Sequence, residues 1–387
     1  MRRLLLACAA TLLAGPVSAQ CGGPFNSFVA GLKSEAVSRG HAPETVDRFF
    51  ATARQDPAVL RADRAQGVFQ RPFLDFSRRL ISQNRIQRGR QNAERYAGVF
   101  DRIEAQYGVS RGVLLAFWAF ETDYGAVQGD FNTLNALVTL SHDCRRPDLF
   151  RPQVFAALEL YENGDFDPDT TTGAWAGEIG MVQMLPGDIL ENGVDGDGDG
   201  HVTLKSSAPD ALMSGANLLS SLGWRPGEPW IQEVVVPDGL DWSLSGPGKP
   251  RPSADWAALG VEAREGQLAD LPASLVLPQG RNGPAFLAYP NFDVYFEWNQ
   301  SFVYVMTAAY FATRLEGAPI YLAGDPDPGL RAKQMMELQR RLAARGHDVG
   351  GVDGILGAGT RTAVQAEQQR LGMPADAWPT VELLNAL

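Results

Sequence analysis

The 387-residue sequence has no excess of basic residues. Its 34 Lys and Arg are outnumbered by 45 Asp and Glu, which gives a formal net charge of −11. This balance argues against binding through a general basic field, so we expect no nucleic-acid partner. The chain also has no tandem repeat and no low-complexity tract. Hydrophobic residues make up 45% of it, which is enough for a substantial core and argues against global disorder.

The N-terminal segment has the parts of a secretory signal. Two arginines at 2–3 precede an apolar stretch at 4–14, and the sequence VSA at 17–19 resembles an A-x-A cleavage site. The apolar stretch is too short to span a bilayer stably. We therefore predict that residues 1–19 are a signal peptide and that the mature protein is periplasmic.

Cysteine is scarce, with three residues in the chain. Cys8 belongs to the predicted signal, which leaves Cys21 and Cys144. An even pair in an oxidising compartment predicts one disulfide, and two unpaired thiols are the alternative. Gln20 stands before Cys21 where a lipoprotein signal has a small residue, so a soluble exported protein is favoured over a lipid-anchored one.

The pattern along the chain is mainly helical, with one interruption. Residues 225–295 are rich in Pro and Gly and contain short apolar runs, which predicts a small mixed β subdomain inserted into a larger helical domain over 20–323. The prolines and charges of 324–329 predict a linker, and a compact tail follows over 330–387. The fold class predicted is α+β, mainly α.

One carboxylate ends the most apolar helical stretch. Eight apolar residues from Val113 to Phe120 precede Glu121. A buried carboxylate is costly unless it is paired or protonated, and burial raises the pKa of such a group. A protonated carboxyl at a cleft edge can act as a general acid, as in sugar-cleaving enzymes. The alternative is a surface glutamate near a helix end.

Several separated motifs resemble, in order and spacing over residues 25–323, those of the membrane-bound lytic transglycosylase B family. The motifs are E-T-x-Y-G from Glu121, A-L-x-T-L-S from Ala136, R-R at 145–146, A-G-x-x-G-x-x-Q-x-x-P at 176–186, and Y-P-N-F followed by W-N-x-S from Tyr289. The resemblance implies a lysozyme-like catalytic domain that cleaves the β-1,4 bond between N-acetylmuramic acid and N-acetylglucosamine in peptidoglycan. It makes glycan strands the substrate and cell-wall synthesis or division proteins candidate partners.

The resemblance also implies how one carboxyl does the chemistry. Glu121 would protonate the leaving oxygen and then, as a carboxylate, deprotonate the muramoyl 6-hydroxyl, which gives a 1,6-anhydro end without water. A second carboxylate is not needed if the acetamido group of the substrate stabilises the positive centre. Asp123 is two residues away and is not expected on the same helix face.

The resemblance implies that Gln183, Arg145 and Arg146 contact substrate and that Asn299 and Tyr304 lie near the catalytic carboxyl. Local structural bonding is the alternative role for each of them. The chain departs from the family at three places, which concern subsite contacts and leave the acid intact. The matching residues are Gln183, Asn299, Tyr304, Arg145 and Arg146, and the departures are Ala174, Met181-Val182 and Trp298, where the family often has Ser, Tyr-Gly and Tyr.

The sequence DGDGDGH at 195–201 has the spacing of an EF-hand-like loop. Oxygen ligands at alternating positions suit Ca²⁺, and the glycine at position 6 allows the sharp turn. Position 12 is Ser206 instead of a bidentate glutamate, so Asp210 is expected to supply the late carboxylate, with Na⁺ as the alternative ion. We predict a structural ion and no organic cofactor; a solvated acidic turn is the alternative. The predicted ligands are Asp195, Asp197, Asp199, His201 and Asp210.

The tail resembles the small peptidoglycan-binding domain of three helices. The resemblance rests on Leu338-Gln339, D-G-I-L-G at 353–357, Thr360-Arg361 and Ala363-Val364. The family usually has an aromatic residue where this chain has Glu367. We predict that the tail tethers the enzyme to the wall; the alternative is that it packs against the catalytic domain.

Together these features predict an exported lytic transglycosylase with a C-terminal peptidoglycan-binding domain. Two alternatives stay open at this point. One is a non-catalytic peptidoglycan-binding protein that keeps the fold, and the other is a muramidase that hydrolyses the same bond with water.

Overall fold

The structure, a computed structural model, describes residues 21–65 and 71–387, so the predicted signal peptide lies outside the described part. Of the described residues, 51% lie in helices and 6% in strands, which confirms the predicted fold class. Among the described helices, none is long and apolar enough to cross a membrane. The chain divides into two compact units. The first contains residues up to Arg64 with Gly129–Ile179 and Leu185–Leu190, and the second contains the rest.

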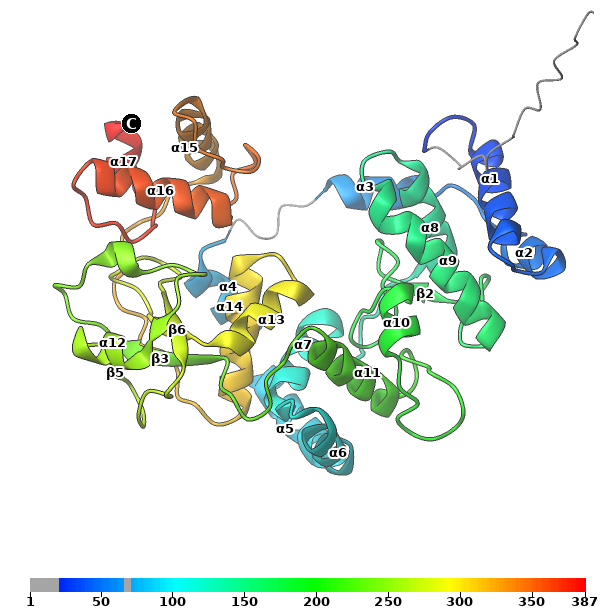
Figure 1. Cartoon of the computed structure of the whole chain (residues 1–387), viewed down its shortest axis with the longest axis horizontal. Helices are drawn as coiled ribbons and strands as arrows, with labels where there is room; N and C mark the ends of the chain where they lie inside the picture. Colours follow the sequence, from blue (N-terminus) through cyan, green and yellow to red (C-terminus); the bar gives the residue numbers. More distant parts are fainter. Residues whose placement is uncertain (1–20, 66–70) are drawn as a thin grey trace, which may run out of the picture. The chain divides into compact units, whose positions relative to one another are not determined.

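The first unit is built on a pair of long helices that lie side by side (Figure 1). Every residue of the first of these, α8, is buried except the last, which explains its apolar sequence. A disulfide joins Cys21 to Cys144, just beyond the end of α8, and Gly22 N–H donates to the His142 carbonyl at 2.9 Å. The elements are α1 (Phe25–Ser38), α2 (Pro43–Phe49), α3 (Pro57–Arg64), β1 (Phe131–Asn132), α8 (Thr133–His142), α9 (Pro147–Asn163) and β2 (Thr172–Gly173).

The helical part of the second unit centres on the packing of α7 against α14. The Ser110 hydroxyl begins α7 by accepting the Gly112 N–H at 3.1 Å, and all residues from Gly112 to Ala119 are buried. The helices are α4 (Phe73–Leu80), α5 (Gln83–Arg95), α6 (Ala97–Tyr107), α7 (Arg111–Thr122), α11 (Ala208–Ser221), α13 (Pro290–Trp298) and α14 (Phe302–Leu315); α10 (Pro186–Asn192) begins in the first unit and ends in the second.

The β subdomain of the second unit is a five-stranded antiparallel sheet in the order β4-β6-β7-β3-β5. Leu275 pairs with Leu287, and both pack with Trp256 and Tyr289 in a separate hydrophobic core. The elements are β3 (Ile231–Val235), the short helix η2 (Trp242–Leu244), β4 (Arg251–Pro252), α12 (Ser253–Ala258), β5 (Glu262–Ala263), β6 (Pro272–Val276) and β7 (Phe286–Ala288).

The C-terminal module has three helices around its own core, as predicted. They are α15 (Ala332–Ala344), α16 (Ala358–Arg370) and α17 (Val381–Ala386). Four residues at the centre of this core are fully buried: Leu338, Leu342, Val364 and Leu383.

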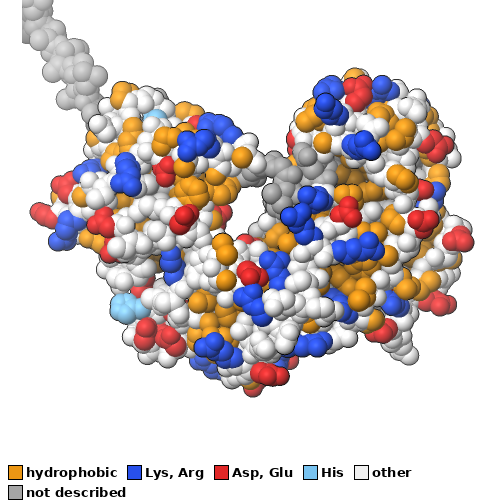
Figure 2. All heavy atoms as spheres, turned by 180° about the vertical axis from the view of Figure 1, so that it is seen from behind, with side chains coloured by type: hydrophobic (Ala, Val, Ile, Leu, Met, Phe, Trp, Pro, Cys, Tyr) orange, Lys and Arg blue, Asp and Glu red, His pale blue; other side chains and the backbone are white. Residues whose placement is uncertain are grey.

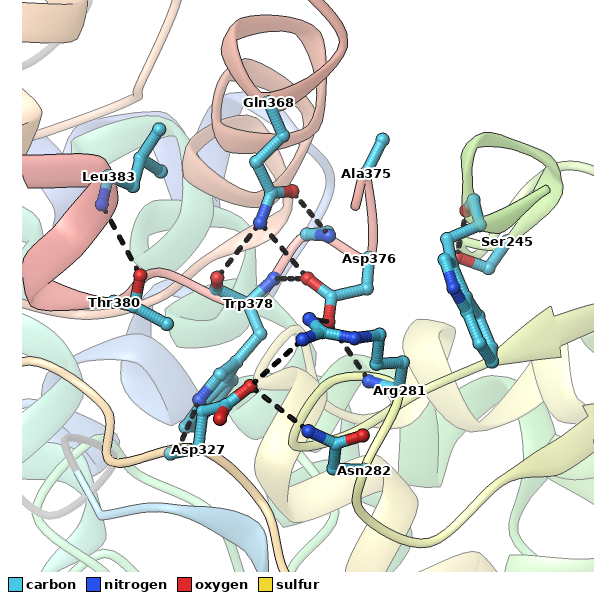
Figure 3. A network of polar contacts seen from close by, with 12 residues as sticks. Ser245, Arg281, Asn282, Asp327, Gln368, Ala375, Asp376, Trp378, Thr380 and Leu383 are labelled. Atoms are coloured by element: carbon cyan, nitrogen blue, oxygen red, sulfur yellow. Dashed lines mark hydrogen bonds and ion pairs between the residues drawn. The ribbon is translucent and has the colours of Figure 1, made fainter. Parts of the chain in front are cut away.

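The module packs against the β subdomain through buried polar contacts. Gln365 Nε2 donates to the carbonyls of Ser245 at 3.0 Å and Trp242 at 3.3 Å. Figure 3 shows Arg281 of the β subdomain between two carboxylates, Asp376 and Asp327. The predicted linker is part of this contact, because the Trp378 indole N–H donates to the Asp327 carbonyl at 2.8 Å. The module is therefore bonded to the β subdomain of the same unit.

On the face drawn in Figure 2, basic and acidic side chains of the described residues are interspersed and form no continuous basic area. Charges of both signs are therefore mixed on this face.

Candidate active site

Glu121 lies in the last turn of α7, where the helix leaves the core. Residues Gly112 to Ala119 are buried, whereas Phe120 and Glu121 are partly exposed. The helix ends because Asp123 adopts a left-handed conformation (φ 51°, ψ 50°), and Tyr124 follows with φ 60°. Positive φ is uncommon for residues with side chains and is found where the surrounding structure fixes it. The backbone thus turns sharply directly after the carboxyl-bearing residue.

Two uncharged donors point at the same oxygen of Glu121. The Tyr304 hydroxyl donates to Oε1, and the Trp298 indole N–H donates to Oε1 at 3.1 Å. Tyr304 comes from the first turn of α14 and Trp298 from the last residue of α13. The Trp298 ring stacks on Phe117 of α7 with centroids 4.3 Å apart, which fixes its orientation. Burial, and then the charge of Glu121, raise the pKa of Tyr304 well above its ordinary value, so its hydroxyl remains a donor.

Asp123 is engaged by arginines on the neighbouring helix. Arg85 Nε donates to Oδ1 at 2.9 Å and Arg88 donates to Oδ2 at 2.6 Å, both from α5. Burial alone would raise the pKa of Asp123, but the hydrogen bonds from Arg88 and Arg85 hold it below its ordinary value. A carboxylate held by two cations is a poor nucleophile, so Asp123 acts as an anchor for the turn after Glu121.

The loop that carries Gln183 is tied to the end of α7. Thr122 Oγ1 donates to the Met181 carbonyl at 2.6 Å and accepts the Gly125 N–H at 2.9 Å. Gln183 has φ 53°, and its side-chain amide donates to the Gly180 carbonyl at 2.7 Å. Gln183 thus lies in the same unit as Glu121. The side-chain amide of Gln183 is bonded within the loop that carries it.

Asn299 makes a local bond that sets the start of α14. Its Oδ1 accepts the Ser301 N–H at 2.9 Å, and the Ser301 hydroxyl accepts the Tyr304 N–H at 3.5 Å. The side chain of Asn299 therefore helps to hold the helix start that presents Tyr304 to Glu121.

Arg145 and Arg146 belong to the first unit and share one buried carboxylate. Both guanidinium groups donate to Asp63, whose side chain is 1% exposed, whereas their own side chains are 49% and 36% exposed. Both arginines thus have a local structural partner, and a contact with substrate stays a prediction. Asp63 is a partner that the sequence did not indicate, because it lies about 80 residues earlier in the chain.

Three of the five predicted ion ligands come together. One carboxylate oxygen each of Asp195, Asp197 and Asp210 lies within 4.8 Å of the others. Asp210 is fully buried and accepts the N–H groups of Gly196 at 2.9 Å and Thr203 at 2.8 Å. Asp199 is outside this cluster.

Asp199 and His201 are bonded to each other within the loop. Asp199 Oδ1 accepts the N–H of His201 at 2.9 Å. The role predicted for His201, a ligand through its backbone carbonyl, stays a prediction.

Sequence reasoning did not assign a role to Trp298 or Thr122. Trp298 was noted only as a departure from a family tyrosine, and its indole N–H now proves to contact Glu121. A tyrosine and a tryptophan each offer one hydrogen-bond donor on an aromatic ring. The replacement of the family tyrosine by Trp298 therefore could have predicted a donor at this position.

Comparisons with known proteins agree with this geometry. Residues 24–313 match the transglycosylase SLT domain, and residues 331–387 match a peptidoglycan binding domain. SltB3 from Pseudomonas aeruginosa, solved in complex with NAG-anhNAM-pentapeptide, is 37% identical, with 94% of this chain and 99% of that chain covered and a TM-score of 0.86. The lytic transglycosylase SLT35 of Escherichia coli, solved in complex with calcium, is 25% identical, with 79% and 98% covered and a TM-score of 0.66.

Membrane-bound lytic murein transglycosylase B of Escherichia coli is 29% identical over 237 residues. The match includes 60% of this chain and spans 64% of the length of that relative. The chain therefore belongs to the lytic transglycosylase family built on the transglycosylase SLT domain, and it carries a peptidoglycan-binding domain at its C-terminal end.

Proposed function

We propose that this protein cleaves the β-1,4 bond between N-acetylmuramic acid and N-acetylglucosamine in peptidoglycan and leaves a 1,6-anhydromuramoyl end. The observation that carries the proposal is the environment of Glu121, a partly exposed carboxyl whose Oε1 accepts two uncharged donors. Membership of the transglycosylase SLT family and the complexes of SltB3 with NAG-NAM-pentapeptide support peptidoglycan as the substrate.

The two donors determine where the transferable proton resides. Because Tyr304 and Trp298 both donate to Oε1, a protonated Glu121 carries its proton on Oε2. That proton goes to the glycosidic oxygen as the C1–O bond breaks, and the resulting carboxylate accepts the proton of the muramoyl 6-hydroxyl as its oxygen bonds to C1. The donors stabilise the carboxylate that exists between the two transfers.

Asp123 has no place in these steps. Its carboxylate is committed to Arg85 and Arg88, so it does not compete as a nucleophile. One carboxyl can act first as acid and then as base, with the substrate acetamido group stabilising the positive centre.

Mass spectrometry of digested peptidoglycan tests the proposal. We expect anhydro ends and no incorporation of ¹⁸O from labelled water. Reducing ends that carry ¹⁸O would instead identify a hydrolytic muramidase, and the absence of products would identify a binding protein that only keeps the fold.

For the loop at 195–210 we propose a structural cation, with Ca²⁺ favoured over Na⁺. The donors of Asp195, Asp197 and Asp210 are all carboxylate oxygens, which suit a hard cation, and three anionic groups so close together repel one another without one. Asp210 would be the buried ligand, because its carboxylate also orders the loop backbone.

Chelation tests the cation. An ion that binds only the folded state at 100 times its Kd stabilises it by about 2.7 kcal/mol, so a chelator should lower the Tm of the wild type. We expect the Tm of Asp197→Ala to be insensitive to chelator, and that of Asp199→Ala to respond nearly as the wild type does, because Asp199 lies outside the carboxylate cluster. Equal responses of all three proteins would mean that the loop is a solvated acidic turn.

We further propose that the protein is exported and acts in the periplasm. The disulfide between Cys21 and Cys144 supports an oxidising compartment. The signal peptide over 1–19 and contacts with cell-wall synthesis or division proteins stay predictions from the sequence.

A further inference from the structure

Three segments of the second unit meet next to the candidate acid. They are the turn at 122–128, the loop at 180–183 and residues 203–205 of the acidic loop. Hydrogen bonds join each of these segments to the other two. The fit of the three segments therefore decides how the loop that carries Gln183 is held.

Gln128 joins the turn to the acidic loop. Its Nε2 donates to the Lys205 carbonyl at 3.0 Å and to the Gly125 carbonyl at 3.2 Å. A side-chain amide nitrogen carries two N–H groups and a carbonyl oxygen only accepts, so these two bonds use both donors and fix which way the amide points. The sequence motifs assign no role to Gln128, because it lies between two of them.

The backbone of Gln128 contacts the side chain of Gln183. The Gln183 Nε2 donates to the Gly180 carbonyl at 2.7 Å and to the Gln128 carbonyl at 3.4 Å. Both N–H groups of this second amide are therefore directed at carbonyl oxygens as well. Among the described residues none donates to Gln183 Oε1, and the side chain is partly exposed. The atom of this amide that can meet a ligand is thus an acceptor.

The acidic loop supports this arrangement from below. The Thr203 N–H donates to the buried carboxylate of Asp210 at 2.8 Å. Leu204 follows, is 2% exposed, and accepts the Met181 N–H on its carbonyl at 2.9 Å. Gly180 has φ 81°, and an added Cβ there would come within 2.4 Å of the Leu204 Cβ. The loop that carries Gln183 therefore lies directly on the acidic loop.

Gln183 is held in an uncommon backbone conformation. Its φ is 53°, in the left-handed region that residues with side chains rarely adopt, and its N–H donates to the Gly180 carbonyl at 3.2 Å. Such a conformation persists where the surrounding contacts over-determine it, and it is concentrated at ligand sites. The contacts from the turn and from the acidic loop supply that determination.

The side chain of Gln128 is not explained by stability alone. Its Oε1 is buried and has no hydrogen-bond partner among the described residues. A buried acceptor without a donor lowers stability, and an apolar side chain of the same length would avoid that loss. The two bonds to carbonyl oxygens are what such an apolar side chain could not make.

We infer that Gln128 is a positioning residue, which holds Gln183 so that it meets the glycan with an acceptor and selects an amide N–H. A hydroxyl group can donate or accept and would not require a fixed amide, whereas an amide N–H can only donate. The N–H belongs to an N-acetyl group of the sugars or to the stem peptide. The inference rests on the proposed function for the identity of the substrate.

Calorimetric titration of the full chain tests the inference with two probes. One is the disaccharide of N-acetylglucosamine and anhydro-N-acetylmuramic acid, and the other is the same disaccharide with a pentapeptide stem. Gln128→Met keeps the length of the side chain but has no N–H, and should weaken binding about tenfold, because two hydrogen bonds that hold the site are lost. Weaker binding of both probes would assign the N–H to a sugar, and weaker binding of the stem-bearing probe alone would assign it to the peptide. Wild-type affinity for both would overturn the inference.

A third probe tests the direction of the hydrogen bond. In it, each acetamido or peptide N–H of the stem-bearing disaccharide is replaced by an ester oxygen. The wild type should bind this ester about tenfold more weakly than the amide, and Gln128→Met should bind the two within about threefold of each other. A wild type that binds ester and amide alike would show that Gln183 does not act as an acceptor, and would overturn the inference.

Matched variants separate positioning from general damage to the fold. Gln91→Met, at an exposed glutamine of α5, should bind both disaccharides as the wild type does. Gly180→Ala should push the two loops apart and weaken binding at least as much as Gln128→Met. Gly227→Ala has a similar positive φ of 74° but meets no atom within 4 Å, and should leave the affinity unchanged. Wild-type binding by Gly180→Ala would count against the inference.

Kinetics distinguish this inference from the proposed function. Gln128→Met should raise the KM for glycan strands about tenfold and keep kcat within threefold and the Tm unchanged, since the bonds of Tyr304 and Trp298 to Glu121 do not involve it. A merely structural role would lower Tm and kcat together. If the wild type neither binds the disaccharides nor releases anhydro products, the proposed function and the inference both fail. If it does both and Gln128→Met keeps its affinity and KM, only the inference fails.

Discussion

The end of α7 and the C-terminal module, both in the second unit, surround their carboxylates with opposite kinds of partner. At the end of α7, Glu121 is contacted by the uncharged donors Tyr304 and Trp298. In the C-terminal module, Glu367 contacts Arg370 and His347, and Asp376 contacts Arg281. Glu367 and Asp376 are 5% and 1% exposed at the side chain, whereas Glu121 is partly exposed.

The difference follows from what each carboxyl has to do. An arginine beside a carboxylate strongly favours the ionised form, which makes a stable anchor and a poor proton donor. Uncharged donors stabilise the carboxylate less, so the group can still hold and release a proton. The hydrogen bond from Arg370, against the opposing effect of burial, holds the pKa of Glu367 below its ordinary value. The environment, not the residue type, separates Glu121, the proposed acid, from the carboxylates of the module.

The largest expected effect comes from removing the proton of Glu121. Glu121→Gln keeps the shape of the side chain and can still contact Tyr304 and Trp298, but it has no transferable proton. Because general acid–base groups contribute roughly 10²–10⁴-fold, turnover of peptidoglycan should fall by that much while the Tm is kept. Glu94→Gln, at an exposed position of α5, is the control. Activity within tenfold of wild type would remove Glu121 from the mechanism.

The uncharged donors can be removed one at a time. Tyr304→Phe and Trp298→Phe each delete one hydrogen bond to Oε1, and the second keeps an aromatic ring against Phe117. Hydrogen bonds to a charged group contribute about 1.5–3 kcal/mol, so each variant should lose roughly 10–100-fold in kcat. A fall in kcat with an unchanged Tm is the signature. If both variants keep kcat within twofold, the two donors do not stabilise the carboxylate during turnover.

The anchors of the module should affect stability instead of turnover. Asp376→Asn removes a charge that Arg281, Gln368 and the Trp378 backbone all contact, and should cost about 1.5–3 kcal/mol of the free energy of unfolding. Asp327→Asn, on the same arginine but 39% exposed and 3.6 Å from it, should cost under about 1 kcal/mol. Denaturant unfolding of the two variants measures the difference. Equal losses would mean that burial does not decide the strength of these pairs.

The smallest expected effect is the pH dependence of Glu367. Because the pKa of Glu367 is lowered in the folded state, its ionised form stabilises the fold above the unfolded pKa of about 4.3, and this contribution is lost as the pH falls through the lower folded value. The wild type should therefore exceed Glu367→Gln in Tm at pH 7, and the gap should close toward pH 3. A gap that stays constant over this range would show that Glu367 contributes through packing and not through charge.

The contacts of segment 324–329 and of the C-terminal module differ from those of a free tail on a linker. The prolines of 324–329 predict a spacer, but Asp325 N–H donates to the Asn282 carbonyl at 2.8 Å and Asn282 Nδ2 donates to Asp327 at 3.2 Å. Gly280 of the β subdomain lies so close to Trp378 that an added Cβ would come within 2.7 Å of its Cβ. These contacts show that the module packs against the β subdomain, and its role in tethering the enzyme to the wall stays a prediction.

The sequence by itself determined the mainly helical class, the family and the identity of the candidate acid, because these depend on local patterns. Helical periodicity, an apolar stretch that ends in Glu121 and motifs in a fixed order can all be read along the chain. The DGDGDG spacing likewise indicated an oxygen-rich loop, although it could not separate Asp199 from the cluster of Asp195, Asp197 and Asp210.

The tertiary structure alone decided which side chains meet. Trp298 and Tyr304 reach Glu121 from 177 and 183 residues away, Asp63 joins Arg145 from 82 residues away, and Arg361 reaches Pro278 across 83 residues. Pairs so far apart in sequence carry no local signal, because their contact depends on helix packing and on where each helix begins. That is why the sequence named the candidate acid and, through the resemblance, Tyr304 near it, while only the fold showed that Tyr304 and Trp298 donate to the same oxygen of Glu121.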